Sequence, residues 1–133
     1  MQSEKLQFKI KKYFMKNDLK ERTYLYALDV IRFIDNLNTR DHSVQVISKQ
    51  LLRSATSIGA NIIEAQAASS KKDFTNFFSY SLKSANESKF WIGLLRDSSK
   101  ADKDLSNKLL RETHEIANIL GSSILTLKGK TKF

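Results

Sequence analysis

The sequence predicts an all-α protein that folds as an antiparallel up-down four-helix bundle. Two observations lead to this prediction. The 133 residues include no proline and only four glycines, so few residues must interrupt a helix. Apolar residues recur every three or four positions in four separate segments, and short polar connections join these segments. Because short connections place neighbouring helices antiparallel, four helices of about 20 to 28 residues predict an up-down bundle.

The first predicted helix runs from about Asp18 to Asn38, and either Asn17 or Asp18 can cap its N-terminus. Residues 1–17 form a basic N-terminal extension in this interpretation, in front of a bundle that spans residues 18–128. The predicted buried stripe of this helix has a helical spacing. It consists of Ala27, Ile31 and Ile34, with Tyr24 and Leu28 beside it.

The second predicted helix starts between Asp41 and Ser43 and ends near Ala68. Seven apolar residues follow one another in it at spacings of three or four, which is typical of the buried seam of a bundle helix. They are Val44, Ile47, Leu51, Ala55, Ile58, Ile62 and Ala65. Gly59 lies inside this helix, where glycine costs about 1 kcal/mol relative to alanine. Its presence favours a close approach of another helix backbone.

Either Ser69 or Ser70 caps the third predicted helix, with Asp73 near the position that a capping box requires. The polar connection 98–102 separates it from the fourth helix, after which Gly129 fits the C′ position and residues 129–133 form a basic tail. The predicted buried residues are Phe74, Phe77, Phe78, Ser81, Ala85, Ser88, Ile92 and Leu95 in the third helix, and Leu105, Leu109, Ile116, Leu120, Ile124 and Leu127 in the fourth.

The composition excludes several kinds of active site. Without cysteine the chain has no disulfide, no thiolate zinc site and no cysteine nucleophile. The glycine spacing excludes phosphate-binding loops, and neither His42 nor His114 follows a glutamate by three residues, as di-metal bundles require. We expect no catalytic residue, no metal and no cofactor. No stretch approaches the roughly 20 apolar residues of a membrane span, and we expect a cytoplasmic protein.

The net charge of +9 is concentrated at the two ends of the chain. Residues 1–22 contain seven basic and three acidic side chains, a net +4, and residues 123–133 contain three basic and no acidic ones. In an up-down bundle these two ends lie together, which predicts one basic pole for a polyanion. The candidate nucleic-acid-binding residues are Lys9, Lys11, Lys12, Lys16, Lys20, Lys128, Lys130 and Lys132.

Small and polar residues lie beside the apolar seams of the second and third helices. Their spacing places each set on one helix face, which predicts a structural polar network between the two helices. Its candidate members are Ser57, Asn61, Glu64, Ser84 and Glu87. The alternative is that Glu64 and Glu87 are solvated surface carboxylates, since glutamate is rarely buried unless it is paired.

Five stretches in order resemble a known family. The run Gln50–Ala65 resembles the central motif of a bacterial four-helix-bundle family related to proteins encoded in intervening sequences of 23S rRNA genes. The other four stretches are Leu19–Tyr24 with Ala27, Lys72–Phe74, Leu82–Lys83 leading to Glu87–Trp91, and Glu115–Leu120 with Thr126–Lys128. Two positions depart from the family pattern: Gly59 stands where many members have proline, and Ser84 where they have glutamate.

The resemblance implies a left-handed bundle that assembles into a ring-like homopentamer without enzymatic activity. It also implies similarity to the accessory variability proteins of diversity-generating retroelements, which are thought to bind nucleic acid and a reverse transcriptase. The leading hypothesis is therefore a non-enzymatic oligomer that binds RNA or DNA through lysine–phosphate contacts. The alternative is a structural or protein-interaction scaffold, for example a partner of a reverse transcriptase. An exposed aromatic patch around Phe90 and Trp91 would favour this alternative.

Overall fold

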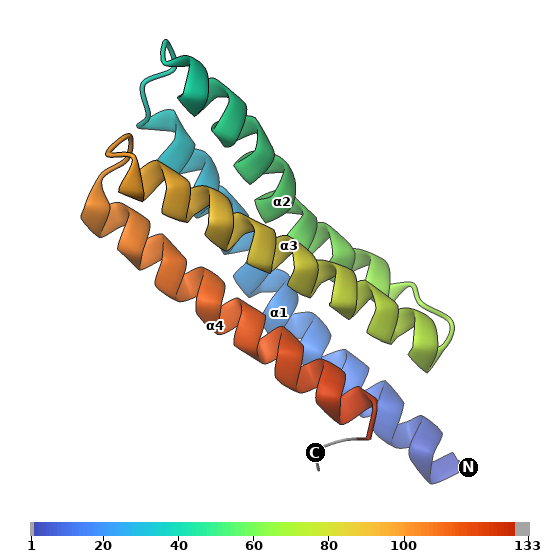
Figure 1. Cartoon of the computed structure of the whole chain (residues 1–133). Helices are drawn as coiled ribbons and strands as arrows, with labels where there is room; N and C mark the ends of the chain where they lie inside the picture. Colours follow the sequence, from blue (N-terminus) through green and yellow to red (C-terminus); the bar gives the residue numbers. More distant parts are fainter. Residues whose placement is uncertain (1, 130–133) are drawn as a thin grey trace.

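The protein is a four-helix bundle. The computed structural model describes residues 2–129 and, from Leu19 onward, their side chains. Within residues 2–129 it contains four helices and no strand, and each helix packs against its neighbours in chain order (Figure 1). The helices are α1 (Gln2–Asp35), α2 (His42–Gln66), α3 (Lys71–Asp97) and α4 (Lys103–Leu127). The predicted all-α four-helix bundle is confirmed.

Helix α1 is longer than predicted. It begins at Gln2 and ends at Asp35, whereas the sequence analysis placed its start near Asp18 and its end near Asn38. The predicted start is therefore wrong. The reason is that residues 2–17 contain no proline or glycine and are rich in lysine, which is a good helix former. Three apolar residues of this stretch, Leu6, Phe8 and Ile10, alternate with polar ones, and the helix runs through them without a break.

The buried face of α1 also differs from the prediction. The predicted stripe leaves Tyr24 65% and Ile31 40% exposed. The buried stripe lies one position away, and it consists of Leu19, Thr23, Tyr26, Val30 and Phe33. Thr23 can occupy this stripe because its hydroxyl donates a 2.6 Å hydrogen bond to the carbonyl of Leu19, one turn earlier.

The caps and seams of α2 and α3 agree with the prediction. Asp41 accepts a 3.1 Å hydrogen bond from the backbone amide of Val44, and Ser70 accepts one from that of Asp73. Ser70, not Ser69, is thus the N-cap of α3. All predicted seam residues of the two helices are buried apart from Ile47 and Phe77, which pack against the core while partly exposed.

Helix α4 is capped by Asp102, and Gly129 has a φ of +73°, as expected for a C′ glycine. The predicted burial of Leu105 is wrong, since this residue is 47% exposed. Ser106 takes the buried position in its place and donates a 2.6 Å hydrogen bond to the carbonyl of Asp102. The remaining predicted core residues of α4 are buried or nearly so.

Helices α1 and α2 lie close together at Gly59. A Cβ atom built on Gly59 would lie 3.1 Å from Oγ1 of Thr23, so the glycine permits the contact that the sequence indicated. Helix α2 ends seven residues after Gly59, and α1 runs in the opposite direction. Residues of α1 before about position 16 therefore extend past α2, over about 20 Å at 1.5 Å per residue. Figure 1 shows this projection beside the end of α4.

Candidate nucleic-acid interface

The start of α1 and the end of α4 lie at the same end of the bundle, which we call the basic end (Figure 1). Lys20 and Lys128 are exposed there. The candidates Lys9, Lys11, Lys12 and Lys16 belong to α1, but their side chains lie outside the described part of the structure, and Lys130 and Lys132 lie outside the described residues altogether. Two of the eight candidate lysines therefore have described side chains at the basic end. Four more are described only as positions in α1.

The start of α3 adds two lysines that the sequence analysis did not select. Lys71 and Lys72 are exposed at the first turn of α3, which begins where α2 ends. The up-down order of the helices places this turn at the basic end. The same order, already predicted from the sequence, could have identified Lys71 and Lys72 as candidates. Neither Lys71 nor Lys72 forms an ion pair with another residue from Leu19 to Gly129. Exposed acidic residues at this end are Glu21, Glu64 and Asp73.

A layer of buried hydroxyl groups crosses the middle of the bundle. The hydroxyls of Tyr26 in α1 and Thr113 in α4 lie 2.6 Å apart, and those of Ser54 in α2 and Ser88 in α3 lie 2.8 Å apart. Thr113 donates to the carbonyl of Leu109, so its oxygen accepts the proton of Tyr26. Burial raises the pKa of Tyr26 to about 12, and hydrogen bonds with Thr113 and Ser88 offset part of that rise. The layer therefore ties together all four helices.

The predicted polar network does not join the helices as a unit. Ser57 and Asn61 each donate to a carbonyl of their own helix, at 2.7 and 2.8 Å. Glu64 is exposed, and Ser84 contributes its carbonyl to Ser88. Only Glu87 reaches another helix among these five residues.

Glu87 accepts hydrogen bonds from two side chains. The guanidinium of Arg53 in α2 donates to its carboxylate at 2.8 Å, and the indole nitrogen of Trp91 donates at 3.0 Å. Arg53 is mostly exposed, so this α2–α3 ion pair lies at the surface and adds little stability. The Glu87 carboxylate also fixes the indole of Trp91, whose ring lies edge-on to that of Phe90.

A second charged cluster joins α1 to α4. The guanidinium of Arg22 donates two hydrogen bonds to Glu112, at 2.7 and 3.0 Å, and a further one to Glu115. These carboxylates raise the pKa of Arg22 above its ordinary value, with the hydrogen bond to Glu112 as the main cause. Arg22 therefore fastens α1 to α4, the pair of neighbouring helices that packs least extensively in the described part of the chain.

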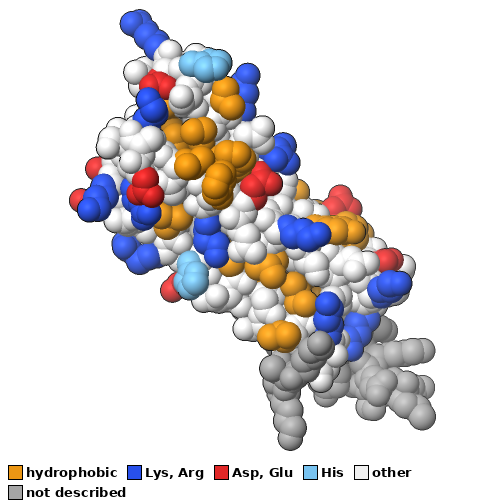
Figure 2. All heavy atoms as spheres, in the orientation of Figure 1, with side chains coloured by type: hydrophobic (Ala, Val, Ile, Leu, Met, Phe, Trp, Pro, Cys, Tyr) orange, Lys and Arg blue, Asp and Glu red, His pale blue; other side chains and the backbone are white. Residues whose placement is uncertain are grey.

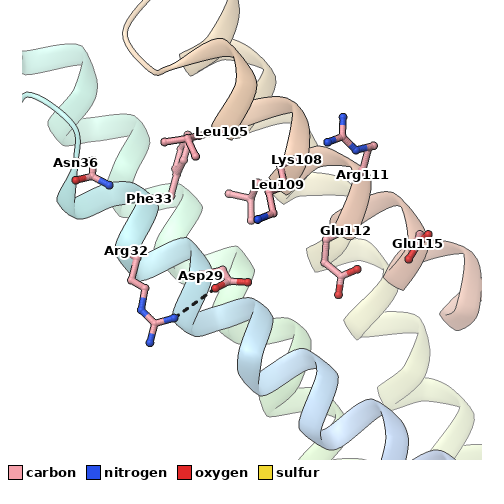
Figure 3. A pocket seen from close by; sticks show the side chains of 10 residues that line it. All are labelled: Asp29, Arg32, Phe33, Asn36, Leu105, Lys108, Leu109, Arg111, Glu112 and Glu115. Carbon is pink, nitrogen blue, oxygen red and sulfur yellow. Dashed lines mark ion pairs between the residues drawn. The ribbon is translucent and has the colours of Figure 1, made fainter.

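Beside this cluster, α1 and α4 separate to form a groove of about 510 Å³. Phe33 and Leu109 form its floor, and charged residues of both signs stand on its rim (Figure 3). Arg32 in α1 pairs with Asp29 of the same helix at 3.5 Å. Across residues 19–129, no group of three His, Asp or Glu residues is arranged to hold a metal. The groove therefore has no metal-ligating donor set among its described residues.

Apolar side chains are exposed in two further places. A groove of about 450 Å³ runs between α1 and α2, lined by Tyr24, Ala27, Ala60 and Ile63 around Gly59. On α3, Phe90 is 58% exposed and Leu94 is also exposed. Figure 2 shows hydrophobic side chains gathered on the face formed by α3 and α4. None of the helices in residues 2–129 combines the length and apolar character needed to cross a membrane.

Comparisons with known proteins agree with the bundle. A family model described as 23S rRNA-intervening sequence protein matches residues 15–122. The chain is also similar to a protein of unknown function from the S23 ribosomal protein family of Bacteroides thetaiotaomicron, whose crystal structure is known. The TM-score is 0.74 and the identity 35%, over 79% of this chain and 96% of that chain. No curated protein matches the chain.

Proposed function

Because this chain belongs to the family of 23S rRNA-intervening sequence proteins, we propose that it is a non-enzymatic, oligomeric bundle that binds RNA or DNA through its basic end. The observation that carries the proposal is that the start of α1 and the end of α4 meet at one end of the bundle, together with the exposed Lys20, Lys71, Lys72 and Lys128. Most of the net charge of +9 belongs to those ends, while the remainder of the chain is nearly neutral.

The chemistry of such a site is electrostatic. Lysine is a flexible point charge that contacts phosphate oxygens without reading the bases. Each contact releases condensed counterions, so affinity falls steeply as salt rises. The proposed role is therefore sequence-tolerant binding of a phosphodiester backbone.

Fluorescence anisotropy tests this proposal. Labelled 20-nucleotide single-stranded RNA, duplex RNA and duplex DNA are titrated with the protein at 50 and 200 mM salt. We expect binding at 50 mM and a marked loss at 200 mM. A variant that lacks residues 1–16 and 129–133 is expected to keep the bundle and lose this binding. Absence of binding to every probe at low salt would contradict the proposal.

The proposed oligomer is a homopentamer, as the family resemblance implies. The apolar groove between α1 and α2 supports self-association, because a monomer would leave Tyr24, Ala27 and Ile63 in contact with water. Light scattering is expected to give about five times the chain mass of 15.3 kDa. Ile63→Lys should reduce this mass, whereas Leu125→Lys, on an exposed position of α4, should not. A monomeric wild type contradicts the oligomer.

A second candidate function, a protein-interaction scaffold, is favoured by the exposure of Phe90 and Leu94 beside Trp91. Its test is gel filtration with a purified reverse transcriptase from a diversity-generating retroelement. Co-elution that Phe90→Ser abolishes, and that Tyr80→Ser on the same helix leaves intact, supports the scaffold. Separate elution of the wild-type protein and the enzyme argues against it.

A further inference from the structure

A pocket of about 450 Å³ lies between α3 and α4, in the half of the bundle away from the basic end. We call it the α3–α4 pocket. Helix α3 contributes one residue to its lining, and successive turns of α4 contribute the others. The lining residues are Arg96, Asn107, Leu110, Arg111, His114 and Glu115. Arg111 and His114 are exposed, so a ligand can reach this pocket from solvent.

The pocket contains hydrogen-bond donors that no described residue accepts. The guanidinium of Arg96 donates to Oδ1 of Asn107 at 2.8 Å and twice to the carboxylate of Asp97, so two of its five N–H groups are left over. Within the described part of the chain, the amide nitrogen of Asn107 and the imidazole of His114 have no hydrogen-bond partner. A histidine carries at least one N–H group in either protonation state. These side chains therefore suit a ligand that brings its own acceptor oxygens.

Arg111 brings an uncompensated positive charge to the pocket. Glu115 follows Arg111 by one turn of α4, a spacing at which such residues commonly pair. The carboxylate of Glu115 is instead bound to Arg22 of α1, which also holds Glu112. Arg111 forms no ion pair with any side chain that the structure describes. The Arg22 cluster thus turns two acidic groups toward α1 and leaves a cation at the α3–α4 pocket.

The surface between this pocket and the basic end also favours an anion. Helix α4 has no acidic residue after Glu115. On α3, Lys89 lies two turns before Arg96 on the same side of the helix. On α4, Lys128 lies about four turns after His114 on nearly the same side. Neither lysine pairs with a carboxylate among residues 19–129. Figure 2 shows lysine and arginine side chains along this face of the bundle.

We propose that the α3–α4 pocket binds a phosphate group of the nucleic acid that the basic end holds, so that the bound strand continues along the face between α3 and α4. This inference rests on the proposed function and adds a second contact site to it. Arginine presents paired N–H groups that match the oxygens of phosphate. From His114 to Lys128 the helix rises about 21 Å, which corresponds to about six nucleotides of a duplex strand. A 20-nucleotide probe is therefore long enough to reach both places.

Anisotropy on the full chain tests the inference, with the single-stranded RNA, duplex RNA and duplex DNA probes. The pocket variant is Arg111→Ala with His114→Ala. The control variant, Lys49→Ala with His42→Ala, also removes one strong cation and one histidine, from exposed positions of α2. Alanine favours the helix at all four positions, so the circular dichroism of both variants should match that of the wild type.

We expect the pocket variant to bind about fivefold or more weakly than the wild type at 50 mM salt, because charged hydrogen bonds to phosphate are lost. The slope of log affinity against log salt for duplex probes should become shallower by about 1, the change for one lost phosphate contact. The control variant should stay within about twofold of the wild type.

Inorganic phosphate distinguishes a nucleic-acid backbone from a free phosphate compound as the ligand. Amide NMR signals of the isotope-labelled protein are followed while inorganic phosphate replaces chloride at constant ionic strength. Signal changes confined to the pocket, together with unaltered nucleic-acid binding by the pocket variant, assign the pocket to a free phosphate compound and overturn the inference.

The anisotropy results separate this inference from the proposed function. A loss confined to the pocket variant supports both. Equal affinities of the pocket and control variants overturn the inference and leave binding at the basic end in place. Absence of binding by the wild type overturns both.

Discussion

At the scale of single residues, the core depends on hydroxyl groups. The buried polar residues between Leu19 and Gly129 are all serine or threonine: Thr23, Ser54, Thr75, Ser81, Ser88, Ser106, Thr113 and Ser123. Each donates a hydrogen bond to a main-chain carbonyl, and all but Ser81 use their own helix. A buried polar group costs little once it is paired. These small residues therefore occupy seam positions that a hydrophobicity pattern assigns to larger apolar ones.

Replacing Tyr26 by phenylalanine tests the hydroxyl layer. The change removes the 2.6 Å hydrogen bond to Thr113 while keeping the buried ring. We expect the free energy of unfolding to fall by about 1 kcal/mol, a typical net value for one buried hydrogen bond. Urea denaturation measures this difference. Tyr24→Phe, on the exposed side of the same helix, should leave the midpoint unchanged, and an equal loss at Tyr24 would refute the role of the layer.

The pH dependence of stability gives a second test of Tyr26. Its pKa is raised from 10.0 to about 12 in the folded protein. The unfolded chain therefore ionises first, so this contribution is complete below pH 10 and is lost as pH rises toward 12. The loss from this one group is about 2 to 3 kcal/mol. Urea denaturation at several pH values should show a smaller decline in Tyr26→Phe than in wild type. Equal declines, or a Tyr26 phenol that ionises near pH 10 in absorbance, would contradict the assignment.

At the scale of the helices, the sequence predicted α2 and α3 well and α1 less well. In α2 most apolar residues occupy one stripe, so periodicity identifies the buried face, although Val46, Leu52 and Ile63 lie outside it. In α1 two stripes share the same spacing one position apart, and the stripe with Thr23 looks less apolar than the one with Ile31. Leu105 and Ser106 present the same choice in α4. Periodicity determines the spacing of a seam, but the partner helices decide which of two adjacent stripes is buried.

The candidate sites were less predictable than the helices. The convergence of the chain ends follows from four helices in up-down order, and the same order gives the position of Lys71 and Lys72. By contrast, Arg22 reaches Glu112 across 90 residues of sequence, and no local pattern signals such a pair. The bond between Tyr26 and Thr113 is of the same kind. Contacts between helices depend on their relative rotation, which one sequence leaves open.

The three glycines inside helices should respond differently to alanine. Alanine is favoured over glycine by about 1 kcal/mol in a helix interior. Gly93 and Gly121 have open space at the Cβ position, so Gly93→Ala and Gly121→Ala should each stabilise the protein by up to about 1 kcal/mol. At Gly59 the new methyl group meets Thr23, whose hydroxyl is fixed by its bond to Leu19. Gly59→Ala should therefore give no gain or a loss.

A double-mutant cycle with Thr23→Ala isolates the cause. Shortening Thr23 removes the atoms that crowd Gly59, so Gly59→Ala should become less destabilising in that background by about 1 kcal/mol. Thermal and urea denaturation of the four proteins provide the cycle. Additive effects would show that the close approach of α1 and α2 does not limit this position.

At the scale of the whole molecule, stability and charge belong to different parts of the chain. The most N-terminal buried residue described is Leu19, and the core continues from there to Leu127. Residues 1–22 and 123–133, by contrast, hold most of the net positive charge. A nearly neutral bundle avoids self-repulsion in its core region, while the lysines extend from one end. This separation predicts that binding and folding can be changed independently.

Deleting residues 1–16 tests that separation. The deletion removes no described core residue and leaves Asp18 in the new first turn of α1, where a carboxylate favours the helix N-terminus. We expect the free energy of unfolding to change by less than about 0.5 kcal/mol, the range of surface changes. The helical circular dichroism signal should fall by about one seventh, in proportion to the residues removed from the four helices. Deleting residues 1–20 instead also removes the buried Leu19, and should cost about 2 kcal/mol or more. A large loss from the shorter deletion, measured at equal protein concentration, would mean that the projecting half of α1 packs against another surface and is not free to bind a polyanion.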